Sequence, residues 1–284
     1  MMLICNNCGS NVLDNMEHCP TCHTFVGFPN VRAAERKEEI DALESRYQQA
    51  IKAAEADGFH QCLKSFEDSM KKTCAVINVD LDYLQHFITT DKALYSNYSL
   101  QVRGEVRKPA MDQDDKARRT VESMLFGSYA EEIRYAALSL DGAGLRSYGP
   151  YAMKLREIAI SKRASLLEDN SYHFIEKHNI RCGKPIPVGY MSTWQERYKL
   201  AVSKLADRIS SVTSEEEYAR ILLLFSGGDR KTDDYIEIHI YGSFDNRAVE
   251  SVRGKSSAGK KHEHALLATV KEYLVKAGKE WIEE

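Results

Sequence analysis

The sequence lacks a long hydrophobic run and an excess of charge of either sign. No apolar run is longer than Ile221 to Phe225, whereas a membrane-spanning helix needs about 20 residues. The 39 Lys and Arg residues against 42 Asp and Glu give a net charge of −3, so no global basic field points to nucleic acid. The N-terminal residues lack the pattern of a signal peptide. We therefore expect a cytoplasmic protein without membrane contact.

Composition favours a folded chain. Hydrophobic residues make up 43% and charged residues 29% of the 284 residues, which supports a packed core and excludes wholesale disorder. This length suits one large domain with an accessory module, or two modest domains. No internal repeat is visible.

Four of the seven cysteines form one sharp motif near the N-terminus. Cys5 and Cys8 are separated by two residues, as are Cys19 and Cys22, and ten residues lie between the pairs. This spacing brings four sulfurs to one point, as tetrahedral Zn²⁺ prefers. Two disulfides are the alternative, which the missing secretory signal disfavours. We predict a structural zinc, because four thiolates leave no ligand position for a substrate.

The segment around this motif carries almost no charge. Residues 1–30 contain no Lys or Arg, and Asp14 and Glu17 are their only charged side chains. A module without cations cannot neutralise phosphates. The pattern therefore favours a structural role or contact with a protein over nucleic-acid binding. His18 and His23 flank the second cysteine pair, and we expect them at the surface and not as ligands.

Composition divides the chain into three parts. We assign residues 1–30 to a zinc ribbon, 31–72 to a helical arm or linker, and 73–284 to the body. The middle part has apolar residues at helical spacing on both sides of Gly58, which suits either a helical hairpin that joins ribbon to body or a short coiled-coil arm.

The body shows strands and helices in mixed order without a repeated βα unit, which predicts an α+β fold. Expected strands cover Cys74–Asp80, Ala136–Leu140, Tyr151–Leu155 and Arg163–Leu167. Expected helices cover Leu81–Ile88, 112–137, Trp194–Ile209, a capped segment from Ser214 to about Phe225, and Ala265–Lys276.

A late segment alternates strictly between apolar and polar residues. In Tyr235–Gly242 the isoleucines share one face, and Tyr235, Glu237, His239 and Tyr241 share the other. A polar face of this kind lines a wet cleft or, equally well, faces solvent on an edge strand. A polar loop with two glycines, Ser226–Asp234, comes directly before this segment.

Three segments together resemble the ADP-ribosyltransferases. They are Ala137–Gly149, which ends in glycine turns, Arg163–Ser171, which contains Arg-x-Ser, and Tyr235–Gly242, which has one glutamate after a loop. The resemblance spans roughly residues 95–250. It implies a mixed or antiparallel split-sheet body that uses NAD⁺ as substrate. It also suggests a bacterial toxin or phage-defence effector, controlled by an antitoxin or chaperone protein.

The resemblance also implies roles for single residues. Glu237 corresponds by position to the catalytic glutamate, and Tyr235 stands where some members carry the first acid of Glu-x-Glu. The loop before it, residues 226–234, corresponds to the segment that recognises the acceptor. The implied NAD-binding residues are Tyr148, Arg163, Ser165, Asn170, Ser171 and His239.

A carboxylate suits this chemistry. Cleavage of the bond between nicotinamide and ribose passes through an oxocarbenium-like state, as in glycoside cleavage, and a nearby carboxylate stabilises the developing positive charge. An arginine suits a pyrophosphate and an aromatic ring can stack on a base.

A basic segment near the C-terminal end concerns the choice of acceptor. Arg253–His262 contains four cations and no acid. It nearly matches a phosphate-binding loop, but Lys261 stands where Ser or Thr must bind Mg²⁺, which excludes that interpretation. The loop Arg253–Lys261 slightly favours RNA over protein as the macromolecular acceptor. The alternative function is a non-catalytic adaptor whose zinc ribbon recruits a protein partner.

Overall fold

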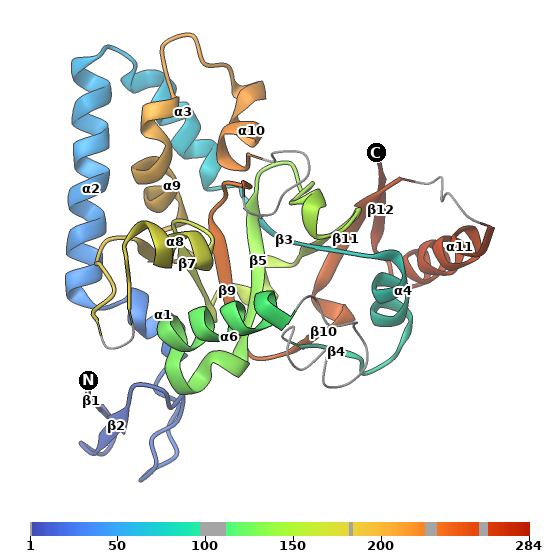
Figure 1. The fold of residues 1–284 in the computed structure, drawn as a ribbon, viewed down its shortest axis with the longest axis horizontal. Helices are drawn as coiled ribbons and strands as arrows, with labels where there is room; N and C mark the ends of the chain where they lie inside the picture. The colour runs from blue at the N-terminus through green and yellow to red at the C-terminus, as the bar shows by residue number, and fades with distance from the viewer. Residues whose placement is uncertain (1, 97–111, 182–183, 225–231, 256–260) are drawn as a thin grey trace.

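The computed structural model describes residues 2–96, 112–181, 184–224, 232–255 and 261–284. It shows a mixed α/β protein built on one large mixed sheet (Figure 1). The eight strands are hydrogen bonded in the order β12-β11-β6-β3-β5-β9-β7-β8. Their bounds are β3 Cys74–Val79, β5 Ile133–Ser139, β6 Tyr151–Leu155, β7 Ala164–Leu167, β8 Met191–Thr193, β9 Glu237–Tyr241, β11 Val249–Gly254 and β12 Glu280–Glu283.

Strand β3 joins two halves of this sheet. It pairs with β5 through residues 74–76 and with β6 through residues 76–79, so that only Val76 pairs with both neighbours. All pairs are antiparallel except that of β11 with β12. The two halves of the sheet are thus hydrogen bonded to each other through this one strand.

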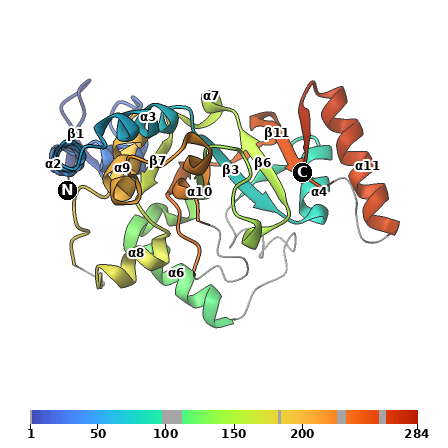
Figure 2. The same cartoon turned by 90° about the horizontal axis from the view of Figure 1, so that it is seen from above.

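Helices cover both halves of the sheet (Figure 2). Helices α2, α3 and α9 pack together beside β8, α4 packs on α11 at the opposite end, and α6 packs on α8. The helix bounds are α1 Pro29–Ala34, α2 Lys37–Ala56, α3 His60–Met70, α4 Leu81–Thr89, α6 Asp112–Phe126, α7 Glu157–Ile160, α8 Ser171–Lys177, α9 Arg197–Leu205, α10 Tyr218–Leu222 and α11 Lys261–Lys276.

The segment 31–72 lies against the body. It forms the end of α1, then α2 and α3, and both longer helices contact α9. Leu63, Phe66 and Met70 on α3 are fully buried and belong to the main hydrophobic core. The structure therefore shows the helical hairpin and not a projecting coiled-coil arm. Gly58, with φ of 75°, lies between the two helices as the sequence predicts.

Strand β9 lies in the middle of the sheet, between β5 and β7. Ile236, Ile238 and Ile240 are fully buried, and on the opposite face Glu237 is 5% and His239 1% exposed. The alternation is confirmed, but the hypothesis of a solvent-facing edge strand is wrong. The polar face of β9 is covered by protein.

Three predicted helices are shorter than expected. The helix predicted over Trp194–Ile209 is α9, Arg197–Leu205, followed by a 3₁₀ turn at Ala206–Arg208. The helix predicted over 112–137 ends at Phe126, and after a 3₁₀ segment, Gly127–Glu132, the chain enters β5. Gly127 has a φ of 55°, which other residues rarely adopt, so the helix stops there. The capping box of Ser214 and Glu217 is present. Its helix α10 ends at Leu222 because Leu224 pairs with Asp234, and Phe225 lies outside the described residues.

The N-terminal ribbon consists of β1 Met2–Ile4 and β2 Asn11–Leu13, paired antiparallel. It contacts the body at several points: the Phe28 ring lies 5.3 Å from that of Tyr241, and Asn15 Nδ2 donates to Ser128 Oγ at 2.7 Å. Arg32 on α1 donates back to the carbonyl of Asp14 at 2.7 Å. A further two-stranded pair, β4 Leu94–Tyr95 with β10 Phe244–Asp245, lies beside the main sheet.

None of the helices in the described part of the chain is both long enough and apolar enough to cross a bilayer.

Candidate functional site

The end of β7 brings a second segment beside Glu237. The antiparallel register pairs Leu167 with Glu237 and Ser165 with His239. The chain that follows Leu167 therefore continues past the carboxylate of Glu237. Here it turns at Asn170, whose Oδ1 accepts from the backbone N–H of Tyr172 at 2.9 Å and caps α8.

Glu237 is held mainly through one of its oxygens. Oε1 accepts from the backbone N–H of Ser171 at 3.2 Å, from Ser171 Oγ, and from His239 Nε2 at 2.8 Å. Among the described residues, Oε2 accepts from the Tyr235 hydroxyl alone, at 3.3 Å. The arrangement is a buried carboxylate with one oxygen fixed and one weakly engaged.

Tyrosine and asparagine side chains connect this carboxylate with the surface. Asn170 Nδ2 donates to the Tyr235 hydroxyl at 2.7 Å, and the hydroxyls of Tyr235 and Tyr148 lie 3.3 Å apart. Burial raises the pKa of Tyr235 well above its usual value, so its hydroxyl keeps a proton to donate. Asn170 and Tyr148 are half-buried. We call Tyr148, Asn170, Ser171, Tyr235, Glu237 and His239 the Glu237 network.

His239 extends this network inward. Its ring is edge-on to those of Phe126 at 4.8 Å and Tyr135 at 5.5 Å. Its Nδ1 is buried and has no hydrogen-bond partner in the described part of the chain. The side chain thus contacts Glu237 on one side and aromatic carbon on the other.

Five of the seven site residues expected from the resemblance lie together, namely Tyr148, Asn170, Ser171, Glu237 and His239. The other two contact different groups. Ser165 Oγ accepts from Asn30 Nδ2 at 3.1 Å, and Arg163 donates to the carbonyls of Tyr241 and Ser243 at 3.0 Å. Burial lowers the pKa of Arg163. In these positions Arg163 braces the end of β9, and its role toward a pyrophosphate stays a prediction.

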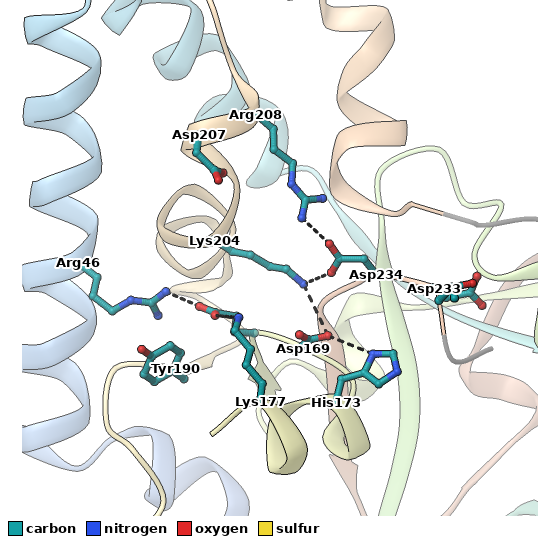
Figure 3. Close-up of a pocket in the computed structure, with 12 residues that line it drawn as sticks. Arg46, Asp169, His173, Lys177, Tyr190, Lys204, Asp207, Arg208, Asp233 and Asp234 are labelled. Atoms are coloured by element: carbon teal, nitrogen blue, oxygen red, sulfur yellow. Dashed lines mark hydrogen bonds and ion pairs between the residues drawn. The ribbon is translucent and has the colours of Figure 1, made fainter. Parts of the chain in front are cut away.

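A cavity of about 490 Å³ lies next to the network (Figure 3). It shares two chain segments with the network, because Asp169 precedes Asn170 and because Asp233 and Asp234 precede Tyr235. Its lining is strongly charged and consists of Arg46, Glu168, Asp169, His173, Lys177, Tyr190, Lys204, Asp207, Arg208, Thr232, Asp233 and Asp234.

The charges in this cavity are paired unevenly. Lys204 and Arg208 both contact the carboxylate of Asp234. Burial alone would raise the pKa of Asp234, but these two cations outweigh it and lower the pKa. Asp169 has Lys204 Nζ at 4.0 Å and His173 Nδ1 at 3.9 Å, and burial raises its pKa. One carboxylate is thus held charged while its neighbour binds protons more readily.

Sequence reasoning missed most of this cavity. Arg46 comes from α2 and contacts Glu168 at the end of β7, and its guanidinium lies 4.1 Å from the Tyr190 ring centre. Lys204 comes from α9. These residues are far apart in the sequence and carry no motif, so only the packing of α2 and α9 on the sheet could reveal them.

The four N-terminal cysteines form a second candidate site. Their Sγ atoms all lie within 4.8 Å of one another, with Cys5 and Cys22 3.6 Å apart and Cys8 and Cys19 also 3.6 Å apart. None of the four forms a disulfide bond. This group is positioned to hold a metal ion, as the spacing predicts. Within the described residues it is the one such group of three or more potential ligands, and it includes neither His18 nor His23.

The basic loop is described only at its ends. Arg253 donates to the carbonyl of Asp141 at 3.0 Å, and Lys261 begins α11. The residues between, 256–260, lie outside the described part of the chain, as do 225–231 of the loop before β9. The acceptor roles expected of both loops therefore stay predictions.

The sequence matches no model of a known protein family, and no curated protein sequence is significantly similar to it.

Proposed function

We propose that this protein transfers ADP-ribose from NAD⁺ to a macromolecular acceptor, with Glu237 as the catalytic carboxylate. The observation that supports this most is the burial of Glu237 on a central strand, with four hydrogen bonds that fix its orientation. In the reaction the bond between ribose C1′ and the nicotinamide nitrogen breaks and nicotinamide leaves with the electron pair of that bond. A nucleophilic atom of the acceptor forms a new bond to C1′ and gives up its proton to water.

The chemistry of the site fits this proposal. Positive charge develops on the ribose as nicotinamide leaves, and a fixed carboxylate stabilises that charge without reorganisation. The adjacent cavity, at about 490 Å³, falls within the usual range for small-molecule sites. Tyr148 is half-buried and offers a ring for stacking on a substrate ring.

The fold adds support. The resemblance to ADP-ribosyltransferases implies a split sheet, and β3 pairs with its two neighbours along different stretches. The strand that carries Glu237 lies in the half that contains β5, β9, β7 and β8. A toxin or phage-defence role, an antitoxin or chaperone partner, and RNA as the acceptor remain parts of the proposal that rest on the resemblance and on the basic loop.

Nicotinamide release from NAD⁺ tests the enzyme directly. Purified protein should release nicotinamide, and Glu237→Gln should lower the rate about 10²- to 10³-fold with an unchanged circular dichroism spectrum. Glu250→Gln is the matched control, because Glu250 lies on β11 of the same sheet and pairs only with Lys154 at the surface. A wild-type protein that releases no nicotinamide, with or without cell extract, would exclude the transferase.

We further propose that the cysteine group binds one Zn²⁺. Tetrahedral Zn²⁺ with bonds near ~2.3 Å places its sulfurs roughly 3.8 Å apart, close to the 3.6 Å separations of the two pairs. Backbone N–H groups of Cys22 and Thr21 donate to Cys19 Sγ and lower the pKa of that thiol. Such donors stabilise thiolates, which are the form that binds metal.

A specific observation supports the adaptor as a second candidate function. Leu3 and Val12 pack inward in the ribbon, while Ile4 and Leu13 are 63% and 49% exposed and Phe25 is 49% exposed. Several exposed apolar side chains on so small a module suit contact with a protein. If the ribbon recruits a partner, Phe25→Ser should lose a partner that wild-type protein retains, whereas Ile158→Ser, at an exposed site on α7, should keep it.

A further inference from the structure

The protonation of His239 follows from its surroundings. Nε2 lies 2.8 Å from Glu237 Oε1, and a carboxylate oxygen can only accept, so Nε2 carries a proton. Nδ1 is buried without a partner, and a proton there would be a buried donor with its hydrogen bond unmade. The geometry therefore assigns a neutral imidazole protonated at Nε2.

Among the described residues, neither Glu237 nor His239 forms an ion pair with any other group. The ring of His239 is enclosed by Phe126 and Tyr135, and its register partner on β7 is Ser165. The remaining polar neighbour is Ser171, whose Oγ lies 3.3 Å from Nε2. Since the imidazole is neutral, the pair of Glu237 and His239 keeps one full negative charge. An imidazolium in the same place would cancel it.

The two oxygens of Glu237 consequently differ. Oε1 accepts from three donors, two on Ser171 and one on His239. Within the part of the chain that the structure describes, Oε2 accepts one longer bond, from the Tyr235 hydroxyl. This oxygen lies on the side of the network that leads to the half-buried Tyr148 and Asn170. A ligand that replaces this weak contact would meet an oxygen whose orientation is already fixed.

We propose that His239 is a positioning residue, which fixes Glu237 through Oε1 as a neutral donor and so leaves the negative charge of Oε2 for the ribose. This inference rests on the proposed transferase function. It moves His239 from direct contact with NAD⁺, where the resemblance places it, to a role that acts through Glu237. Its burial, with 1% exposure, agrees with that change.

Nitrogen NMR of protein labelled with ¹⁵N-histidine tests the assigned proton without any substrate. The His239 signals are identified by their absence in His239→Gln. We expect one protonated and one unprotonated ring nitrogen at neutral pH, with the proton on Nε2. An imidazolium, or a proton on Nδ1, would overturn the inference whether or not the protein cleaves NAD⁺.

Kinetics test the positioning role. His239→Leu removes the donor, and we expect kcat for nicotinamide release to fall about 10- to 100-fold while KM for NAD⁺ stays nearly constant. His239→Gln keeps an N–H donor and should recover most of that rate. Unchanged kcat in the leucine variant, or a change confined to KM, would refute positioning. Absence of cleavage by the wild type would instead refute the transferase, and the NMR result would still decide the state of His239.

Discussion

The side-chain amide of Asn170 forms hydrogen bonds with both α8 and Tyr235. Its Oδ1 accepts from the backbone N–H of Tyr172 at 2.9 Å, and its Nδ2 donates to the Tyr235 hydroxyl at 2.7 Å. The helix cap and the Glu237 network are therefore fixed by the same side chain. A change at this position affects helix stability and site geometry together unless the two ends are altered separately.

Two substitutions separate these roles. Asn170→Asp keeps an oxygen for the cap and loses the donor to Tyr235, so stability should stay near that of the wild type while NAD⁺ cleavage falls about tenfold. Asn170→Ala loses both and should also lower the free energy of unfolding by about 1 kcal/mol. Urea unfolding and nicotinamide release measure the two effects. Equal loss of stability in both variants would show that Oδ1 does not cap α8.

The sequence indicated much of this network, because its signals are local. The alternation in Tyr235–Gly242 predicted which side chains share a face of β9, and Asn170 and Ser171 follow a recognisable strand and turn. What the sequence could not show is burial. Glu237 is shielded from solvent by segments from distant parts of the chain. Strands β5 and β7 pair with β9 on either side, and α8 lies against the carboxylate.

The charged cavity was beyond sequence reasoning for the same reason. Arg46 and Lys204 reach it from α2 and α9, which meet only when both pack beside β8. The helix predicted over 112–137 failed at Gly127 because apolar residues of α6 and of β5 formed one continuous helical pattern. The positive φ of that glycine depends on the folded structure, and the spacing of apolar residues in the sequence does not show it.

Metal removal should affect the ribbon alone. We expect one Zn²⁺ per chain by elemental analysis, and we expect Cys19→Ser to lose the metal and unfold residues 1–30, because this module has only a small core. The body has its own large core and should keep its unfolding transition. Cys62→Ser, outside the metal group, is the control and should keep the zinc. A folded ribbon without metal would contradict the prediction.

Low pH should lower the stability of the fold because it protonates Asp234. Its pKa is lower in the folded chain than the usual 3.8, so its contribution to stability is fully present above that value and is lost as the pH falls through the lowered pKa. Asp234→Asn should cost about 1–2 kcal/mol at neutral pH and should lose less stability than the wild type on acidification. Asp207→Asn is the control, because Asp207 lines the same cavity and forms no ion pair within the described residues. Unfolding curves from pH 7 to pH 2 provide the comparison, and parallel pH profiles for Asp234→Asn and the wild type would contradict the prediction.

Gly149 fixes the turn that carries Tyr148 against β3. Its φ is 154°, and a Cβ at this position would lie 2.3 Å from the carbonyl carbon of Val79. Because the obstacle is backbone, no rotamer change relieves it. Gly149→Ala should therefore lower the free energy of unfolding by more than 2 kcal/mol.

Gly142→Ala provides the matched control, because that glycine also has a positive φ, 75°, but no atom within 4 Å of its added Cβ. It should cost only the backbone strain, about 1–2 kcal/mol. The difference in unfolding free energy between the two variants measures the close approach of the turn to β3. If the two variants were equally stable, the turn could move away from Val79 to make room for the added Cβ. The 3.3 Å contact between the Tyr148 and Tyr235 hydroxyls would then not depend on the close packing of Gly149 against β3.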